Sequence, residues 1–205
     1  MKKYTTLSIL FIFTFACTLT IFFSGCESDD PTKENTPELI TRVTLTFTPD
    51  GGGTVVTATA SDPDGEGVQD IAADGPVTLA ASTSYTLTVA LVNELADPLD
   101  PEYDITAEVE EESDEHMFFF SFTEDAFSSP AGNGNTDNRN DPLNYNDEDA
   151  NGLPLGLETT WTTGNALPSG SLRIILKHQP DQKSATSDVA VGETDLDVTF
   201  DLVIE

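Results

Sequence analysis

The chain has 205 residues, of which 37 are Asp or Glu and only 8 are Lys or Arg, so its formal net charge at neutral pH is −29. This length suits one domain, with or without a tail. Hydrophobic residues make up 38% of the chain, which is too large a share for a wholly disordered protein. So few basic residues in so negative a field would repel phosphates, and nucleic-acid binding is therefore excluded.

Residues 1–25 have the features of a bacterial lipoprotein signal peptide. Two Lys residues precede an apolar run over residues 7–23, and that run is short for a membrane span. It ends in Phe-Ser-Gly before Cys26, which resembles the lipobox, in which small residues precede a Cys that is diacylated. The resemblance implies a mature chain that begins at Cys26 and is anchored there in outer-membrane lipid. The alternative is an ordinary signal peptide with an incidental Cys.

Residues 26–37 are predicted to form an acidic tether. Glu27, Asp29 and Asp30 lie in a polar, Pro-bounded stretch that has no apolar period. Acidic residues directly after the lipidated Cys resemble the surface-export signal of Bacteroidota lipoproteins, which implies the cell surface. A plain spacer and the periplasmic face are the alternative. Cleavage also removes Cys17, so the mature chain cannot form a disulfide.

From residue 38 to residue 205, alternating apolar residues predict the strands of one domain. The strongest alternation covers residues 39–47, 85–91, 172–176 and 196–204, and weaker candidates cover 54–60, 77–82, 105–110, 117–122 and 157–163. About eight short strands predict an all-β fold, an antiparallel two-sheet sandwich of immunoglobulin-like type, with a β-barrel as the alternative. The Glu-rich run 104–116 is ambiguous between helix and strand.

The last predicted strand has two chemically different faces. Its apolar residues recur at every second position from Leu196 to Ile204. Asp195, Asp197 and Asp201 take alternate positions, so we expect all three carboxylates to face water.

One loop fits the spacing of calcium-binding loops, D-x-[DN]-x-[DN]-G-x5-E. The predicted calcium ligands are Asp147, Asp149, Asn151, the Leu153 carbonyl and a bidentate Glu158. Calcium needs several oxygens at one point, and alternate residues of a tight loop can supply them. The flanking residues are typical of strands rather than helices, which excludes a paired EF-hand. The alternative is a plain hairpin that turns at Asn151-Gly152.

The two histidines and nearby carboxylates form an alternative metal site. His116 begins one predicted strand and His178 ends another, each on the apolar face of its strand. If these strands are antiparallel neighbours, both imidazoles lie at the same end of the sandwich, near Glu112 and Glu115. Such a set would bind zinc or iron. The alternative is a pair of histidines that hydrogen-bond to carboxylates without a metal.

Catalytic motifs are missing from the sequence, which has no G-x-S-x-G elbow, no phosphate-binding Gly loop with Lys and no H-E-x-x-H. We therefore expect a protein that is not an enzyme. The favoured function is a non-catalytic module that captures a ligand or partner at the outer membrane, stabilised by calcium and associated with a transporter. The alternatives are a transition-metal acquisition protein and a structural or adhesive surface domain.

Four stretches carry a resemblance to a family: residues 91–94, 104–116, 156–160 and 192–198. They resemble small flavobacterial lipoproteins that are commonly labelled type 1 periplasmic binding fold superfamily proteins, and the resemblance covers most of residues 39–205. That label implies a two-lobed α/β protein, whereas the strand periods of this chain predict an all-β fold. The family has no established biochemical activity, so the resemblance implies no site residues.

Overall fold

The computed structural model describes residues 38–65 and 71–205, all of which belong to the unit Asn35–Glu205. The predicted signal peptide 1–25 and tether 26–37, including Cys26, lie outside the described residues. Among the helices of the described residues, none has the length and apolar character that crossing a membrane requires.

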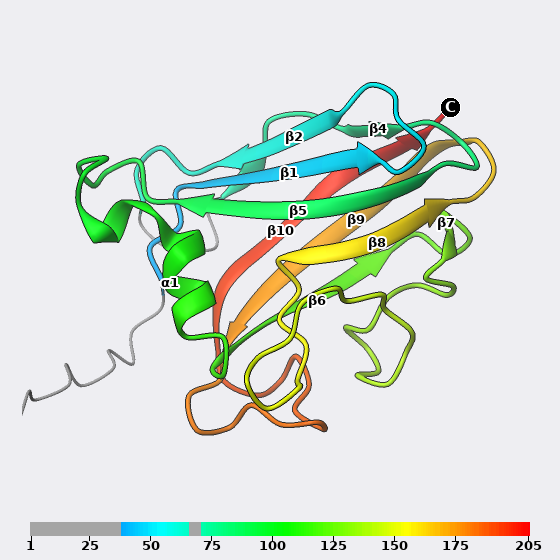
Figure 1. Ribbon diagram of the computed structural model, residues 1–205. Coiled ribbons are helices and arrows are strands. Elements are labelled where there is room, and N and C mark those ends of the chain that lie inside the picture. The colour runs from blue at the N-terminus through cyan, green and yellow to red at the C-terminus, as the bar shows by residue number, and fades with distance from the viewer. Residues whose placement is uncertain (1–37, 66–70) are drawn as a thin grey trace, which may run out of the picture. The chain divides into compact units, whose positions relative to one another are not determined.

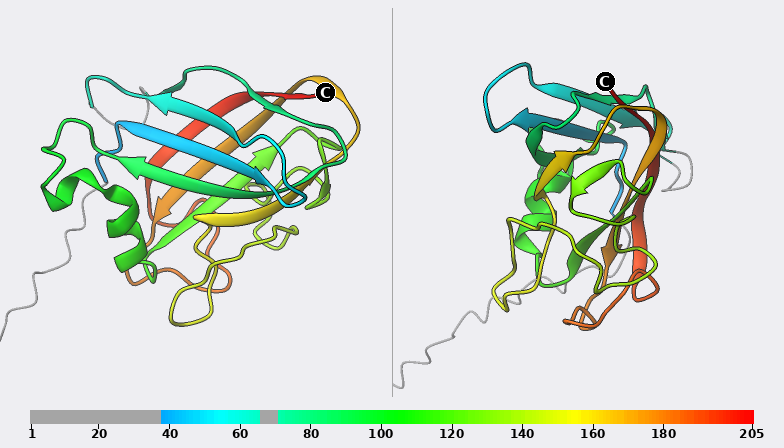
Figure 2. Two further views of the ribbon diagram at one scale, coloured as in Figure 1. Left: turned by 45° about the horizontal axis from the view of Figure 1, so that its top comes forward. Right: turned by 90° about the vertical axis from the view of Figure 1, so that its right-hand side faces the viewer.

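Two facing sheets make up the described residues (Figures 1 and 2). The elements in chain order are β1 (Arg42–Pro49), β2 (Val56–Ser61), β3 (Ala72–Ala73), β4 (Val77–Leu79), β5 (Ser84–Val92), η1 (Pro101–Tyr103), α1 (Ile105–Glu111), β6 (His116–Phe122), β7 (Phe127–Ser129), β8 (Glu158–Thr163), β9 (Leu167–His178) and β10 (Glu193–Ile204). One sheet has the order β3-β2-β1-β5-β8-β7 and the other β4-β10-β9-β6. The predicted all-β, two-sheet sandwich is confirmed. One pair, β10 with β4, is parallel, which the antiparallel prediction did not include.

The core lies between the sheets and is built from the alternating apolar residues of both. Trp161 is fully buried at its centre, with ring centroids 5.5 Å from Phe120, 5.4 Å from Phe122 and 4.7 Å from Phe127. The indole Nε1 donates a hydrogen bond of 2.7 Å to the Thr159 hydroxyl, so this buried polar group is satisfied. These aromatic contacts pack β8 against the second half of β6.

The ambiguous Glu-rich run begins with a helix, so the strand alternative for residues 105–110 was wrong. Asp104 caps α1, because its carboxylate accepts a hydrogen bond of 3.2 Å from the Ala107 amide. Ile105 and Val109 lie four positions apart and are both buried, whereas Ala107 between them is exposed. The helical period therefore governs burial here, and α1 delivers the chain to β6.

Loop residues cover the outer edge of β6. The Phe118 amide donates to the Leu155 carbonyl at 2.7 Å, and Phe122 donates to Asn133 at 2.9 Å. Between them, the Asn135 side chain accepts from the Phe120 amide at 3.0 Å. These bonds use backbone groups that an open sheet edge would leave unpaired, so the edge that carries His116 is protected from further strand pairing.

Candidate metal centre

The two histidines meet at one end of the sandwich, where they are directly opposite each other on β6 and β9. Their rings stack with centroids 4.5 Å apart and planes inclined by 6°. His116 is 0% exposed and His178 1% exposed. The antiparallel adjacency that the predicted histidine site required is therefore present. We call these two residues the histidine pair.

The turn between α1 and β6 holds carboxylates against the histidine pair. Figure 1 shows the start of β6, the end of β9 and the start of β10 together beside the last turn of α1. Glu115 Oε2 lies 3.3 Å from His178 Nε2. One ligand atom each from Glu112, His116 and His178 can be chosen so that all lie within 4.8 Å of one another. The structure thus brings together Glu112, Glu115 and the histidine pair, the residues of the alternative metal site.

Asp195 is a site residue that the sequence analysis placed on the wrong face. It was expected to face water, but it is 1% exposed and its Oδ2 lies 3.4 Å from His116 Nε2. The cause is a register shift between Thr194 and Leu196 in the pairing of β10 with β9. Such a bulge turns two consecutive side chains, here Asp195 and Leu196, to the same face, which strict alternation cannot anticipate.

Glu38 is a second site residue that the sequence analysis missed. It precedes β1, and its Oε1 lies 4.0 Å from His116 Nε2, with the side chain 10% exposed. Its backbone amide also donates to Asp195 Oδ1 at 3.4 Å. The residue stands one position before the predicted strand 39–47 and is far from Asp195 in the sequence, so no local signal marks it.

The electrostatics of this end of the sandwich favour a cation. Burial, followed by the neighbouring Glu108 carboxylate, raises the pKa of Glu38 to about 8. Burial lowers the pKa of His116, but the contact with Asp195 and the Glu112 carbonyl outweigh burial, so the pKa is raised. Both pKa shifts favour the protonated form, so a proton is kept among buried carboxylates. A bound metal ion would be stabilised at the same place.

The five predicted calcium ligands lie in a hairpin that its own carboxylates hold together. Asp147 accepts from the Gly156 amide at 2.8 Å and from the Glu158 amide at 3.0 Å. Asp149 Oδ1 accepts from the amides of Asn151 and Leu153 at 2.8 and 2.9 Å.

Three further oxygen atoms of that loop also have partners. Asp149 Oδ2 lies 3.1 Å from the Lys183 ammonium, and the Leu153 carbonyl accepts from the Asp149 amide at 2.8 Å. Glu158 Oε1 accepts from the Asn146 side chain at 3.1 Å. This geometry favours the plain hairpin, and calcium binding by the loop stays a prediction.

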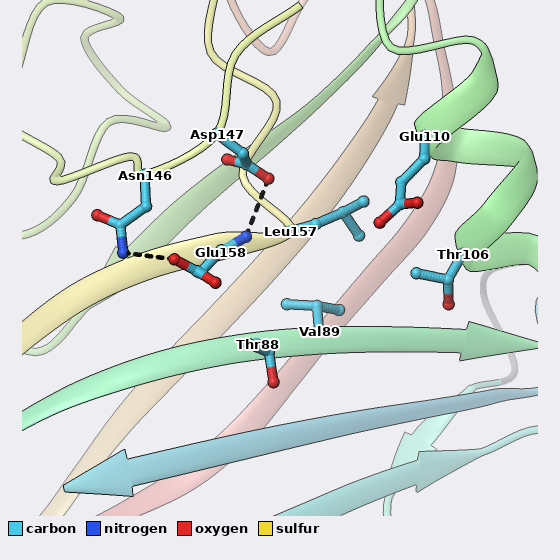
Figure 3. Close-up of a pocket in the computed structure, with 8 residues that line it drawn as sticks. All are labelled: Thr88, Val89, Thr106, Glu110, Asn146, Asp147, Leu157 and Glu158. Atoms are coloured by element: carbon cyan, nitrogen blue, oxygen red, sulfur yellow. Dashed lines mark hydrogen bonds between the residues drawn. The ribbon is translucent and has the colours of Figure 1, made fainter. Parts of the chain in front are cut away.

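A pocket of about 300 Å³ opens between α1, β5 and β8 (Figure 3). It is lined by Thr88, Val89, Thr106, Glu110, Asn146, Asp147, Leu157 and Glu158. Figure 3 shows Glu110 and Glu158 on opposite sides of the apolar residues Val89 and Leu157. Its chemistry suits a small ligand that combines a positive charge with a short apolar part.

Comparisons with protein-family models, with curated proteins and with solved structures find no match to this chain. The resemblance to small flavobacterial lipoproteins therefore stays a prediction. The chemistry of the described site carries the functional argument.

Proposed function

We propose that this protein is a lipid-anchored, non-catalytic protein of the outer membrane that binds a divalent transition-metal ion through His116, His178 and Glu112. The observation that carries the proposal is the buried, stacked histidine pair with carboxylates on both rings. Imidazole nitrogens and carboxylate oxygens are the ligands that zinc and iron take in proteins.

Burial of the ligands supports binding rather than catalysis. Catalytic zinc sites keep one position open for water or substrate, whereas structural and storage sites are closed by protein ligands. His116 and His178 are almost fully buried, so an ion bound at their ring nitrogens would be enclosed. We propose metal acquisition as the role, with delivery to an outer-membrane transporter as partner.

Zinc titration by calorimetry tests the proposal. The chelator-treated mature chain should bind zinc, and His116→Phe with His178→Phe, which keep planar rings in both positions, should abolish binding. Glu112→Gln should weaken it, whereas Glu111→Gln, at the exposed neighbouring carboxylate, should not. No binding by the wild type, or undiminished binding by the double Phe variant, would overturn the proposal.

The outer-membrane anchor rests on the lipobox-like segment that ends at Cys26. Metabolic labelling with an alkyne fatty acid should tag the wild-type protein and not the Cys26→Ala variant. Label that persists in this variant would exclude the anchor at Cys26. Protease treatment of intact cells then separates the cell surface, which the acidic tether predicts, from the periplasmic face.

A second candidate function is capture of a small organic cation in the pocket of Figure 3, and the carboxylates of Glu110 and Glu158 favour it. Amines of increasing size should raise the melting temperature of the wild type and lose this effect in Glu110→Gln with Glu158→Gln. The exposed Glu148→Gln variant is the matched control. Equal shifts in all variants would exclude the pocket as the binding site.

A further inference from the structure

Two buried polar atoms at the metal centre have no hydrogen-bond partner among the described residues. They are His116 Nε2 and Asp195 Oδ2, on side chains that are fully buried. Buried polar groups in folded proteins are almost always paired, because an unpaired one loses its bonds to water without replacement. A cation bound by both atoms would satisfy both at once.

The distance between these atoms fits a shared metal ion. His116 Nε2 and Asp195 Oδ2 are 3.4 Å apart, longer than the preferred length of an N–H···O bond, about 2.9 Å. A tetrahedral zinc ion with ligand distances of about 2.1 Å separates neighbouring ligand atoms by about 3.4 Å. The separation of the two atoms therefore fits two ligands of one ion.

The surroundings of His116 prepare this nitrogen for a metal. His116 Nδ1 lies 3.2 Å from the Glu112 carbonyl oxygen, which can only accept a hydrogen bond. A ring proton is therefore held on Nδ1, and Nε2, which faces Asp195, is the nitrogen at which a metal ion can take the place of a proton. Such a carbonyl contact on the second nitrogen is the usual way in which proteins orient a metal-binding histidine.

We propose that Asp195 and Glu38 complete the metal shell with His116, so that the ion is of the zinc class and is held by residues from three separate segments. This inference rests on the proposed function, in which His116 binds the metal. Glu38 Oε1, 4.0 Å from His116 Nε2, is the third ligand and precedes β1. The fourth position of a tetrahedral shell is left for Glu112 or His178, so this ligand set replaces one of the ligands named in the proposed function. The mixed nitrogen and oxygen ligands select zinc or cobalt(II) over calcium, which prefers oxygen alone.

Because Glu38 comes from a different segment than His116 and Asp195, a bound ion would connect separate parts of the chain. Asp195 lies near the start of β10, His116 begins β6 and Glu38 lies four residues before the start of β1. A shared ion would join these three points, so metal binding should fasten the first described residues to the sandwich. A ligand that binds only when these three points are together stabilises that arrangement, and the stabilisation increases as more of the site is occupied.

Cobalt(II) absorption and hydrogen exchange test the inference on the mature chain in detergent. Wild type should develop the intense visible bands of four-coordinate cobalt, and zinc should slow amide exchange at residues 38–41. Asp195→Asn and Glu38→Gln should each weaken metal affinity at least about tenfold. Asp201→Asn, an exposed carboxylate on the same strand, should bind as wild type does.

The outcomes separate this inference from the proposed function. If wild type binds no metal, the proposed function fails. If wild type binds metal through the histidine pair, but Asp195→Asn binds within twofold of wild type, only the ligand set is overturned. Should Asp195→Asn not fold, exchange at residues 38–41 of the wild type decides, and unchanged exchange on adding zinc overturns the inference.

Discussion

Replacing Lys183 by Met should cost more stability than any surface charge change in this protein. The Lys183 ammonium lies 3.1 Å from Asp149 Oδ2, and the two side chains are 1% and 0% exposed. It also donates a hydrogen bond of 2.7 Å to the Ser113 carbonyl. This buried ion pair therefore joins the 147–155 hairpin, the turn after α1 and the loop between β9 and β10.

The expected loss follows from the charge that the variant leaves behind. Lys183→Met removes the cation but keeps Asp149 buried, and breaking a buried pair in this way costs about 3–5 kcal/mol. Arg173→Met is the matched control, because its ion pair with Asp197 is 42% and 35% exposed. Exposed pairs contribute about 0–1 kcal/mol.

Acid should reduce the loss of stability that Lys183→Met causes, and the direction of the pKa shift of Asp149 shows why. Burial raises the pKa of Asp149, but the Leu153 amide and Lys183 outweigh burial, so the pKa is lowered in the folded wild type. The wild type therefore gains stability from this carboxylate above its unfolded pKa of about 3.9 and loses that gain as pH falls through the folded pKa. Without Lys183 this gain is smaller, so the difference between variant and wild type should narrow on acidification.

Urea unfolding at pH 7 and near pH 4 measures both effects. We expect a loss several times that of Arg173→Met at pH 7 and a smaller loss at the lower pH. A loss no greater than that of Arg173→Met, or one that does not change with pH, would show that Lys183 and Asp149 do not stabilise the fold as a buried ion pair.

Two further predictions concern the loops. Calcium and sodium of matched ionic strength should raise the melting temperature equally, because the hairpin carboxylates, including Asp149, already have partners; a calcium-specific rise that Glu158→Gln removes would restore the calcium loop. Gly134→Ala should destabilise by about 1–3 kcal/mol more than Gly132→Ala in urea unfolding. Both glycines have positive φ, 98° and 96°, but only at Gly134 would a Cβ meet the Phe120 carbonyl oxygen, at 2.0 Å. Equal losses would contradict this packing.

Period-two patterns were enough to predict the sandwich and the histidine pair of the candidate metal centre. The apolar faces of β1, β5 and residues 196–204 of β10 followed strict alternation, whereas β9 is buried on both faces near its end. The shared parity of each histidine with its strand's apolar residues placed both rings inside. The pairing of β6 with β9 then brought His116 against His178. Local chemistry determines these features, so a single sequence reveals them.

Asp195 and Glu38 reach the candidate metal centre through features that period-two alternation does not encode. Asp195 points inward only because a bulge shifts the register of β10, and Glu38 arrives from a segment outside any predicted strand. The helix at 105–111 was ambiguous because Ile105 and Val109 fit either period, and the Asp104 cap decides for the helix. Bulges and long-range contacts are set by tertiary packing, so the sequence pattern missed the carboxylates nearest to His116.

The central claim is that a transition-metal ion binds at the histidine pair, and anomalous scattering at the zinc edge from zinc-soaked crystals tests it most directly. We expect an anomalous peak within bonding distance, about 2.0–2.1 Å, of His116 Nε2 and close to Asp195 Oδ2. An empty histidine pair in crystals whose zinc lies elsewhere, such as at the 147–158 hairpin, would contradict it.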